Sequence, residues 1–230
     1  MSTTNATIHI VKEGDKKSIL EFLLSDYLYK ESINVSCGLS KEEAKYFFTD
    51  LLDVGCSGNE SYILKDSSNV IVGCRLAYLM KREDDNVNEI NLPVEKTFDN
   101  GSKKIVSKCG LKNFEKMKSL LLHVDSKIFK KIPNGVDTLI NFLVITVLDK
   151  YEGKGYEEKL MNHDIELLKE KDVTAMITIT SAPKIQNMFI KFGYECIYSV
   201  SHDEFYDENG CKMFDVKNGT DSIKMLCKKF

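Results

Sequence analysis

The strongest chemical signal in the chain is a pair of glycines between a buried apolar strand and a helix. Val147 and Leu148 end an apolar run, Gly153 and Gly155 follow in a turn, and an amphipathic helix begins near Tyr156. A strand, a glycine turn and a helix start in this order expose backbone N–H groups beside the positive end of a helix dipole, which suits a phosphate or pyrophosphate. The same glycines also suit an ordinary tight turn, and the pattern alone leaves both interpretations open.

This turn differs from the two common nucleotide-binding motifs. It lacks the Gly-Lys-Ser/Thr ending of a P-loop and the third glycine of the dinucleotide-binding fingerprint, which disfavours ATP and NAD. The chain carries 32 Lys and Arg against 35 Asp and Glu, and a net charge of −3 disfavours a dedicated nucleic-acid binder. An anionic ligand must therefore be held by local groups such as this turn.

The sequence predicts no membrane, metal or disulfide chemistry. The first 17 residues contain no apolar signal core, and the most apolar run, residues 139–148, is too short to cross a bilayer. Seven cysteines without a CxxC pair are typical of reduced thiols, and the four histidines form no ligand pair at helical spacing. We expect a cytoplasmic protein that binds no metal, and monomer and homodimer both stay open.

Hydrophobic spacing indicates the elements that must position the turn. Strands are expected over residues 7–11, 61–65, 70–80, 137–148, 173–180, 194–201 and 222–228, and helices over residues 16–29, 40–52, 111–129, 156–171 and 183–192. Ser40 and Glu43 form a capping box at the start of the second helix. Residues 30–39 show no clean period and are predicted to be a loop.

The last part of the chain predicts the fold class. Two strands that read as buried on both faces are separated by a helix, which indicates a parallel β-α-β-α unit within a mixed α/β sheet. No linker or repeat interrupts the order of elements. We therefore expect a single domain over residues 1–230, with a helical insertion over about residues 110–133 that lies on the surface or over a cleft.

The order of these motifs resembles the acetyl-CoA-binding half of the GNAT acetyltransferase superfamily. The resemblance rests on the turn from Tyr151 to Gly155 and on the helix end Phe189-Ile190-Lys191-Phe192-Gly193-Tyr194, and it covers residues 139–201 well. It implies a GNAT fold, with a mixed and mostly antiparallel sheet of about seven strands. The parallel central strands would splay apart, and helices would flank the sheet.

The amino-terminal part resembles the invertebrate type of arylalkylamine N-acetyltransferase. Residues 22–26 and the segment Glu31-Ser32-Ile33-Asn34 are similar to a loop of those enzymes that carries a catalytic glutamate, although Ser32 stands where proline is usual. A helix like residues 40–52 follows that loop, and an insertion like residues 111–132 precedes the central strand.

The resemblance implies a site for acetyl-CoA. Val147 and Leu148 would lie at a bulge of the central strand and offer N–H groups to the thioester carbonyl and to pantetheine. Backbone amides would hold the pyrophosphate, contributed by Glu152, Gly153, Lys154, Gly155, Tyr156 and Glu157.

Two departures from the family pattern affect this site. The acidic side chains of Glu152 and Glu157 stand where the family has Arg or Gln and Gly or Ala, and they oppose pyrophosphate binding. The resemblance also implies that Phe189 is a cofactor-binding position. It takes the place of a tyrosine that protonates the leaving thiolate, which a phenyl ring cannot do.

Glu31 is the candidate general base, because an ammonium must lose a proton before its lone pair attacks a thioester. An exposed loop glutamate is the alternative interpretation, and Asp26 is a second candidate carboxylate. Ser181 resembles a serine of the invertebrate enzymes, which implies that it bonds the cofactor sulfur or orders a water. A helix N-cap explains this serine equally well.

The resemblance thus implies an N-acetyltransferase that uses acetyl-CoA and acts on a small primary amine, with an arylalkylamine such as dopamine, octopamine, tyramine or serotonin as the expected acceptor. Direct transfer in a ternary complex is the expected route. The alternatives are a GNAT-fold CoA-binding module that has lost catalysis, and an acetyltransferase for a polyamine or a protein lysine.

Overall fold

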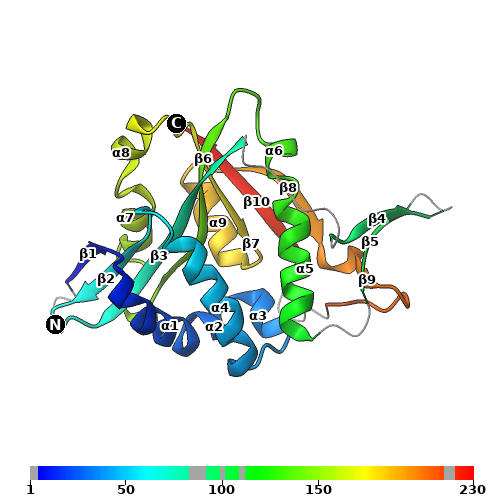
Figure 1. Cartoon of the computed structure of the whole chain (residues 1–230), viewed down its shortest axis with the longest axis horizontal. Coiled ribbons are helices and arrows are strands. Elements are labelled where there is room, and N and C mark those ends of the chain that lie inside the picture. Colours follow the sequence, from blue (N-terminus) through cyan, green and yellow to red (C-terminus); the bar gives the residue numbers. More distant parts are fainter. Residues whose placement is uncertain (1–4, 83–91, 99–101, 109–111, 215–220) are drawn as a thin grey trace.

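A seven-stranded sheet organises the part of the chain that the computed structural model describes, which is residues 5–82, 92–98, 102–108, 112–214 and 221–230. Its strand order is β1-β2-β3-β6-β7-β10-β8 (Figure 1). The strands are β1 (Ala6–Ile10), β2 (Tyr62–Asp66), β3 (Ile71–Lys81), β6 (Thr138–Val147), β7 (Ala175–Thr180), β8 (Glu195–Ser201) and β10 (Ser222–Lys229).

The sheet is mixed and mostly antiparallel, as predicted. Every neighbouring pair is antiparallel except β6 and β7, which run parallel at the centre. This central pair is joined by helices α7 (Tyr156–Asn162) and α8 (Ile165–Glu170), which form the crossover that a parallel pair requires. The predicted β-α-β-α unit is therefore confirmed, with α9 (Pro183–Lys191) as its last helix.

Helices cover both faces of the sheet and divide the core into two large clusters. One face packs against the apolar sides of α1 (Lys16–Ser25), α2 (Tyr27–Lys30), α3 (Ser32–Ser36), α4 (Lys41–Gly55), α5 (Asn113–Asp125) and α6 (Ile128–Lys131). The other face packs against α7, α8 and α9. No helix in the described ranges has the length and apolar character needed to span a bilayer.

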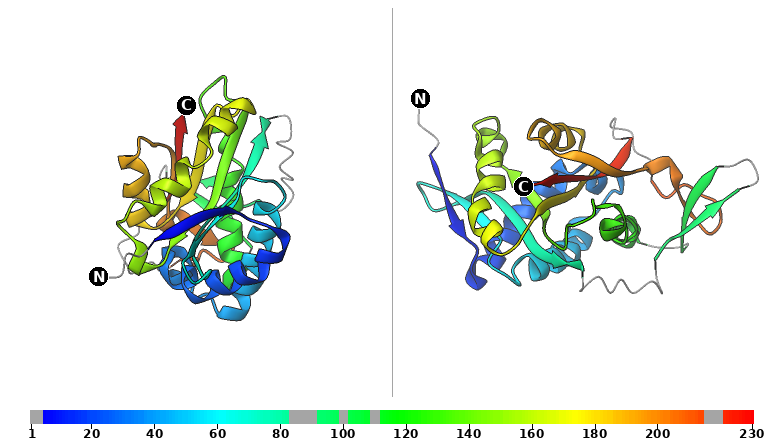
Figure 2. Two further views of the ribbon diagram at one scale, coloured as in Figure 1. Left: turned by 90° about the vertical axis from the view of Figure 1, so that its left-hand side faces the viewer. Right: turned by 90° about the horizontal axis from the view of Figure 1, so that it is seen from above.

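A small second sheet projects from one end of the molecule (Figure 2). It contains β4 (Val94–Thr97), β5 (Lys103–Ser107) and β9 (Phe205–Asp207). Sequence reasoning predicted no strand in these polar segments. Residues 110 and 111, at the start of the predicted insertion, lie outside the described residues, and α5 and α6 form the rest of it.

The predicted helix over residues 156–171 is wrong in one respect, because it is two helices that meet at Asp164. The guanidinium of Arg75 donates to the carbonyl oxygen of Leu160 at 2.8 Å and binds both carboxylate oxygens of Asp164 at 2.8 Å. The buried Arg75 thus occupies a carbonyl oxygen that, in a continuous helix, would accept a hydrogen bond from a backbone amide of the same helix. The expected loop over residues 30–39 also differs, since it contains α3.

Candidate active site

The central strands separate beyond their first residues and leave a gap in the middle of the sheet. β6 and β7 pair only from Leu139–Ala175 to Phe142–Thr178, although β6 continues to Val147 and β7 to Thr180. The register between β3 and β6 shifts at the same level, so that Leu143 is an extra, bulged residue. The splay predicted for the parallel pair is therefore present.

The predicted position of the bulge is wrong. It lies at Leu143 and not at Val147 and Leu148, because β6 keeps its pairing with β3 up to its end. The amide of Leu148 donates to the carbonyl oxygen of Val72 at 2.8 Å and is not free for a ligand. Successive residues of a strand direct their backbone N–H and C=O groups to opposite sides. Because Leu148 faces β3, the amide and carbonyl of Val147 face the gap. The carbonyl oxygen of Val147 accepts there from Lys30 Nζ at 2.8 Å.

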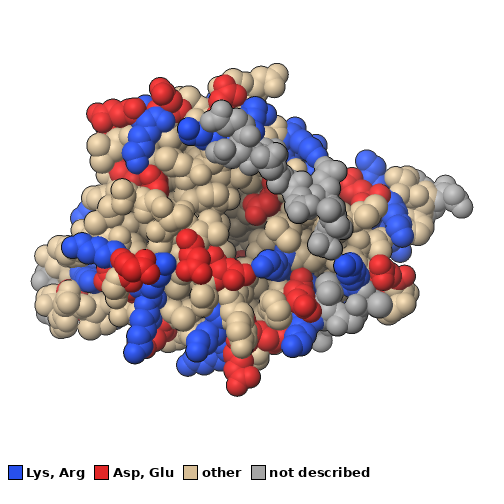
Figure 3. Space-filling model, in the orientation of Figure 1, with Lys and Arg blue, Asp and Glu red and all other residues tan. Residues whose placement is uncertain are grey.

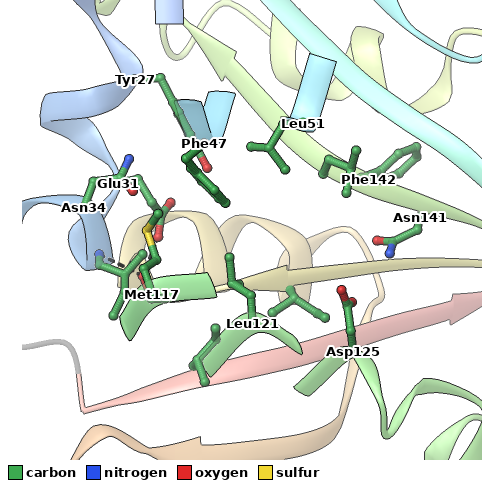
Figure 4. Close-up of a pocket in the computed structure, with 15 residues that line it drawn as sticks. Tyr27, Glu31, Asn34, Phe47, Leu51, Met117, Leu121, Asp125, Asn141 and Phe142 are labelled. Atoms are coloured by element: carbon green, nitrogen blue, oxygen red, sulfur yellow. Dashed lines mark hydrogen bonds between the residues drawn. The ribbon is translucent and has the colours of Figure 1, made fainter. Parts of the chain in front are cut away.

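Two cavities meet at this gap. The first, called the strand-gap cavity, lies between the separated strands and is lined by Lys30, Val147, Glu152, Glu157 and Ala182, among others. The second, called the inner cavity, lies under α4 and α5 and is lined mainly by apolar side chains such as Leu51, Met117 and Ile179 (Figure 4).

Glu31 lines both cavities and forms a buried pair with Ser181. The hydroxyl of Ser181 donates to Glu31 Oε1 and accepts from the amide of Ile33 at 3.1 Å. The exposed fractions are 8% for Glu31 and 1% for Ser181. The structure thus brings together two residues 150 positions apart that sequence reasoning selected separately. It contradicts both alternatives, because Glu31 is buried and Ala182, not Ser181, is the N-cap of α9.

The surroundings of Glu31 suit a group that exchanges a proton. Burial raises the pKa of Glu31 above its ordinary value, and hydrogen bonds from Ser181 and from the amides of Ile33 and Ala182 offset part of the rise. A carboxylate with a raised pKa is a stronger base than an exposed one. Its position between two cavities allows it to reach a reacting group from either side.

The glycine turn lies at the outer end of the strand gap. Gly153 and Gly155 have φ values of +68° and +80°, and a Cβ on either would meet open space. A bound group can therefore approach the backbone closely. Lys154 Nζ donates to the carbonyl oxygen of Lys150, and Tyr156 Oη accepts from the amide of Ala6 at 2.9 Å, so both side chains are tied to the protein.

Two lysines pair with acidic side chains around the strand-gap cavity. Lys184 binds Glu152, and Lys30 binds Asp26 at 3.0 Å and Asp149 at 2.8 Å. Asp26, the second candidate base, is therefore engaged by Lys30 and lines neither cavity. Glu157 lines the strand-gap cavity without an ion pair to any described residue.

The residues present fit the acyl-pantetheine arm of acetyl-CoA, with one mismatch. Beyond the paired residues of β6 and β7, backbone N–H and C=O groups face the strand gap without a hydrogen bond to the opposite strand. The glycine turn also leaves its backbone accessible. The carboxylate of Glu157 is the mismatch beside a diphosphate. Phe189 is 1% exposed, stacks edge-on against Tyr194 and lines neither cavity.

Comparison with known proteins decides the fold. No protein-family model matches the chain, and no curated protein matches it by sequence. Arylalkylamine N-acetyltransferase 2 from Aedes aegypti matches in structure, with a TM-score of 0.75 at 20% identity over 98% of this chain and 99% of that one. The chain has the GNAT acetyltransferase fold.

Two further solved structures share this GNAT fold over nearly their whole length. A mosquito arylalkylamine N-acetyltransferase-like protein 5b has a TM-score of 0.75 at 17% identity, over 98% of this chain and all of that one. The Drosophila melanogaster polyamine N-acetyltransferase, an enzyme that forms N-acetylagmatine, has a TM-score of 0.74 at 13% identity, over 98% of this chain and all of that one.

Sequence reasoning missed several polar residues that line the cavities of this GNAT fold, among them Lys30, Asp125 and Asn141. Lys30 lines the strand-gap cavity, and Asp125 and Asn141 line the inner cavity. Asp125 carried a detectable signal, because it continues the apolar helical face of Met117 and Leu121 at four-residue spacing. An acidic residue on an apolar helix face indicates either a buried partner or a cavity.

Replacing Ser32 with proline is expected to raise Tm by about 1–4 °C. Glu31 has φ −73° and ψ 121°, the extended conformation that a following proline favours. Ser32 is the first residue of α3, where the amide has no helical acceptor. Thermal unfolding of Ser32→Pro measures the shift. Val35→Pro is the control and should destabilise, because the amide of Val35 donates to the carbonyl oxygen of Glu31. A lower Tm for Ser32→Pro contradicts the expectation.

Proposed function

We propose that this protein transfers the acetyl group of acetyl-CoA to a small primary amine. The observation that supports the proposal is that Glu31, paired with Ser181, lines two cavities at once. The thioester arm would enter through the strand-gap cavity and the amine would occupy the inner cavity. Glu31 would then lie beside the reacting nitrogen, where a general base is required.

The reaction follows from these positions. Glu31 accepts a proton from the ammonium, directly or through one water, and the freed lone pair attacks the thioester carbonyl. The carbon–nitrogen bond forms, the attacking nitrogen loses its second proton to solvent, and the carbon–sulfur bond breaks. CoA leaves as a thiolate that takes a proton from solvent, and Glu31 returns its own proton to solvent. Amides of β6 that face the gap, such as that of Val147, would stabilise the oxyanion of the tetrahedral intermediate.

Ser181 acts in this proposal as a positioning residue. Its hydroxyl is held by the amide of Ile33 and donates to Glu31, which fixes the carboxylate toward the cavities. Both an arylalkylamine and a polyamine are acceptors of the same chemical type, because each offers a primary amine. The expected arylalkylamine acceptor stays a prediction.

A steady-state assay tests the proposal. Purified protein is incubated with acetyl-CoA and a panel of amines, free CoA thiol is measured, and the N-acetyl product is identified by mass spectrometry. We expect thiol release that depends on the amine, with one acetylated product per thiol. Binding of CoA without turnover on any amine supports a CoA-binding module instead, and no binding of CoA at all contradicts both.

Replacing Glu157 with Gln is expected to tighten CoA binding about two- to fivefold. Glu157 lines the strand-gap cavity, and its pKa is raised by burial and by the nearby Glu152, so its charge is poorly accommodated beside an added diphosphate. Isothermal titration with CoA at low salt measures the change. Glu158→Gln is the matched control, since Glu158 is exposed in the same helix and lines neither cavity. Unchanged or weaker binding in Glu157→Gln contradicts the expectation.

A further inference from the structure

The inner cavity carries a carboxyl group at each end. Glu31 lies at the end that joins the strand-gap cavity, and Asp125 lies at the far end beside Asn141 (Figure 4). On the face shown in Figure 3, acidic atoms also lie within a hollow near the centre of the molecule. The proposed mechanism uses Glu31 and leaves Asp125 without a role.

In the part of the chain that the structure describes, Asp125 has no partner that explains its position. It is the last residue of α5, whose Met117 and Leu121 line the same cavity. Among the described residues, none forms a hydrogen bond or an ion pair with its carboxyl group. Asp125 is half-buried, and burial raises the pKa of its carboxyl group to about 7.

The space between the two carboxyl groups is apolar. Leu51, Met117, Leu121 and Leu143 line it, together with Ile179 and Ile223. Such walls suit a run of methylene groups and offer no hydrogen bond along the way. The cavity is thus acidic at both ends and apolar in the middle.

We infer that the acceptor is an amine with a second cationic group, such as an α,ω-diamine, whose far end binds Asp125 while its near end is acetylated beside Glu31. This inference rests on the proposed function and narrows its substrate class. A second ammonium would supply the counter-charge that Asp125 lacks. An acceptor with an apolar far end would instead cover the carboxyl group without a partner, which is unfavourable.

Matched pairs of amines test the inference. Values of kcat/KM are measured for α,ω-diamines with three to eight methylene groups and for the n-alkylamines of the same length, with phenethylamine and tyramine alongside. In the wild type, we expect the best diamine to exceed its matched monoamine by about tenfold or more, as for a charge-assisted hydrogen bond. In Asp125→Asn, the ratio of kcat/KM between the diamine and its matched monoamine should fall to about one.

Asp50→Asn is the control for net charge, because Asp50 is an exposed carboxylate of α4 outside the cavity that pairs with Lys118. It should keep the diamine preference. Equal rates for diamines and monoamines in the wild type overturn the inference while the proposed function stands. The inference is also overturned if the preference for diamines over monoamines survives in Asp125→Asn. It is likewise overturned if the enzyme prefers tyramine, shows no preference for diamines, and loses the tyramine preference in Asp125→Asn. Failure to acetylate any amine overturns the proposed function as well.

Discussion

Replacing Glu31 with Gln should lower kcat for amine acetylation by about 10²- to 10⁴-fold, the usual contribution of a general base. Glutamine keeps the size of the side chain and can still accept the hydrogen bond from Ser181. It cannot take a proton from the ammonium. The affinity for CoA should change little, because the strand-gap cavity keeps its shape and its peptide groups.

The pH profile of kcat gives a second readout of the same residue. The pKa of Glu31 is raised by burial, and the carboxylate is the active form. Turnover in the wild type should therefore fall as the pH drops through this raised pKa, above the range in which an exposed glutamate titrates. The residual activity of Glu31→Gln should lack this acidic limb.

Glu21→Gln is the matched control for Glu31→Gln, since Glu21 is an exposed carboxylate of the neighbouring helix α1. It should keep wild-type turnover and the wild-type pH profile. Full activity in Glu31→Gln contradicts the assignment of the base. Equal losses of kcat and of CoA affinity indicate a structural role for Glu31 instead.

Replacing Asp164 with Asn is expected to lower the free energy of unfolding by about 3–5 kcal/mol. Arg75 is fully buried, Asp164 is 6% exposed, and their two-point contact places Nη1 and Nη2 each 2.8 Å from a carboxylate oxygen. The guanidinium also donates to the carbonyl oxygen of Glu60 at 2.6 Å. Asparagine leaves this buried cation without its counter-charge, and urea unfolding measures the loss.

Glu166→Gln is the matched control for Asp164→Asn. Glu166 lies in α8 and pairs with Lys169 at 2.9 Å, but its side chain is 82% exposed. Such a surface pair contributes at most about 1 kcal/mol. A loss below about 1 kcal/mol in Asp164→Asn contradicts the view that this ion pair joins β3 to the junction of α7 and α8.

The sequence predicted those parts of the fold in which local signals and tertiary packing agree. The capping box of Ser40 and Glu43 begins α4 as expected, with the Glu43 amide 3.2 Å from Ser40 Oγ. The break at Asp164 was not predictable from spacing. Its cause is Arg75, which lies 89 residues away and removes carbonyl oxygens from the helix ladder.

The candidate site was predictable residue by residue but not as an arrangement. A resemblance selected Glu31 and Ser181 separately, and only the fold shows that they form one hydrogen-bonded pair. The position of the bulge was missed because it depends on how β3 and β6 share their register, which no local pattern of β6 reveals. Asp125 was visible as an acid on an apolar helix face, but only the cavity gives it a function to test.

A crystal structure with a bisubstrate conjugate, in which CoA is linked through an acetyl bridge to the nitrogen of an amine, tests most directly whether Glu31 stands between donor and acceptor. We predict the pantetheine arm between β6 and β7 and the amine half in the inner cavity. The bridging nitrogen should lie about 2.6–3.2 Å from Glu31, or one water away. Density for both halves on one side of Glu31, or a conjugate bound outside the strand gap, would contradict the proposed function.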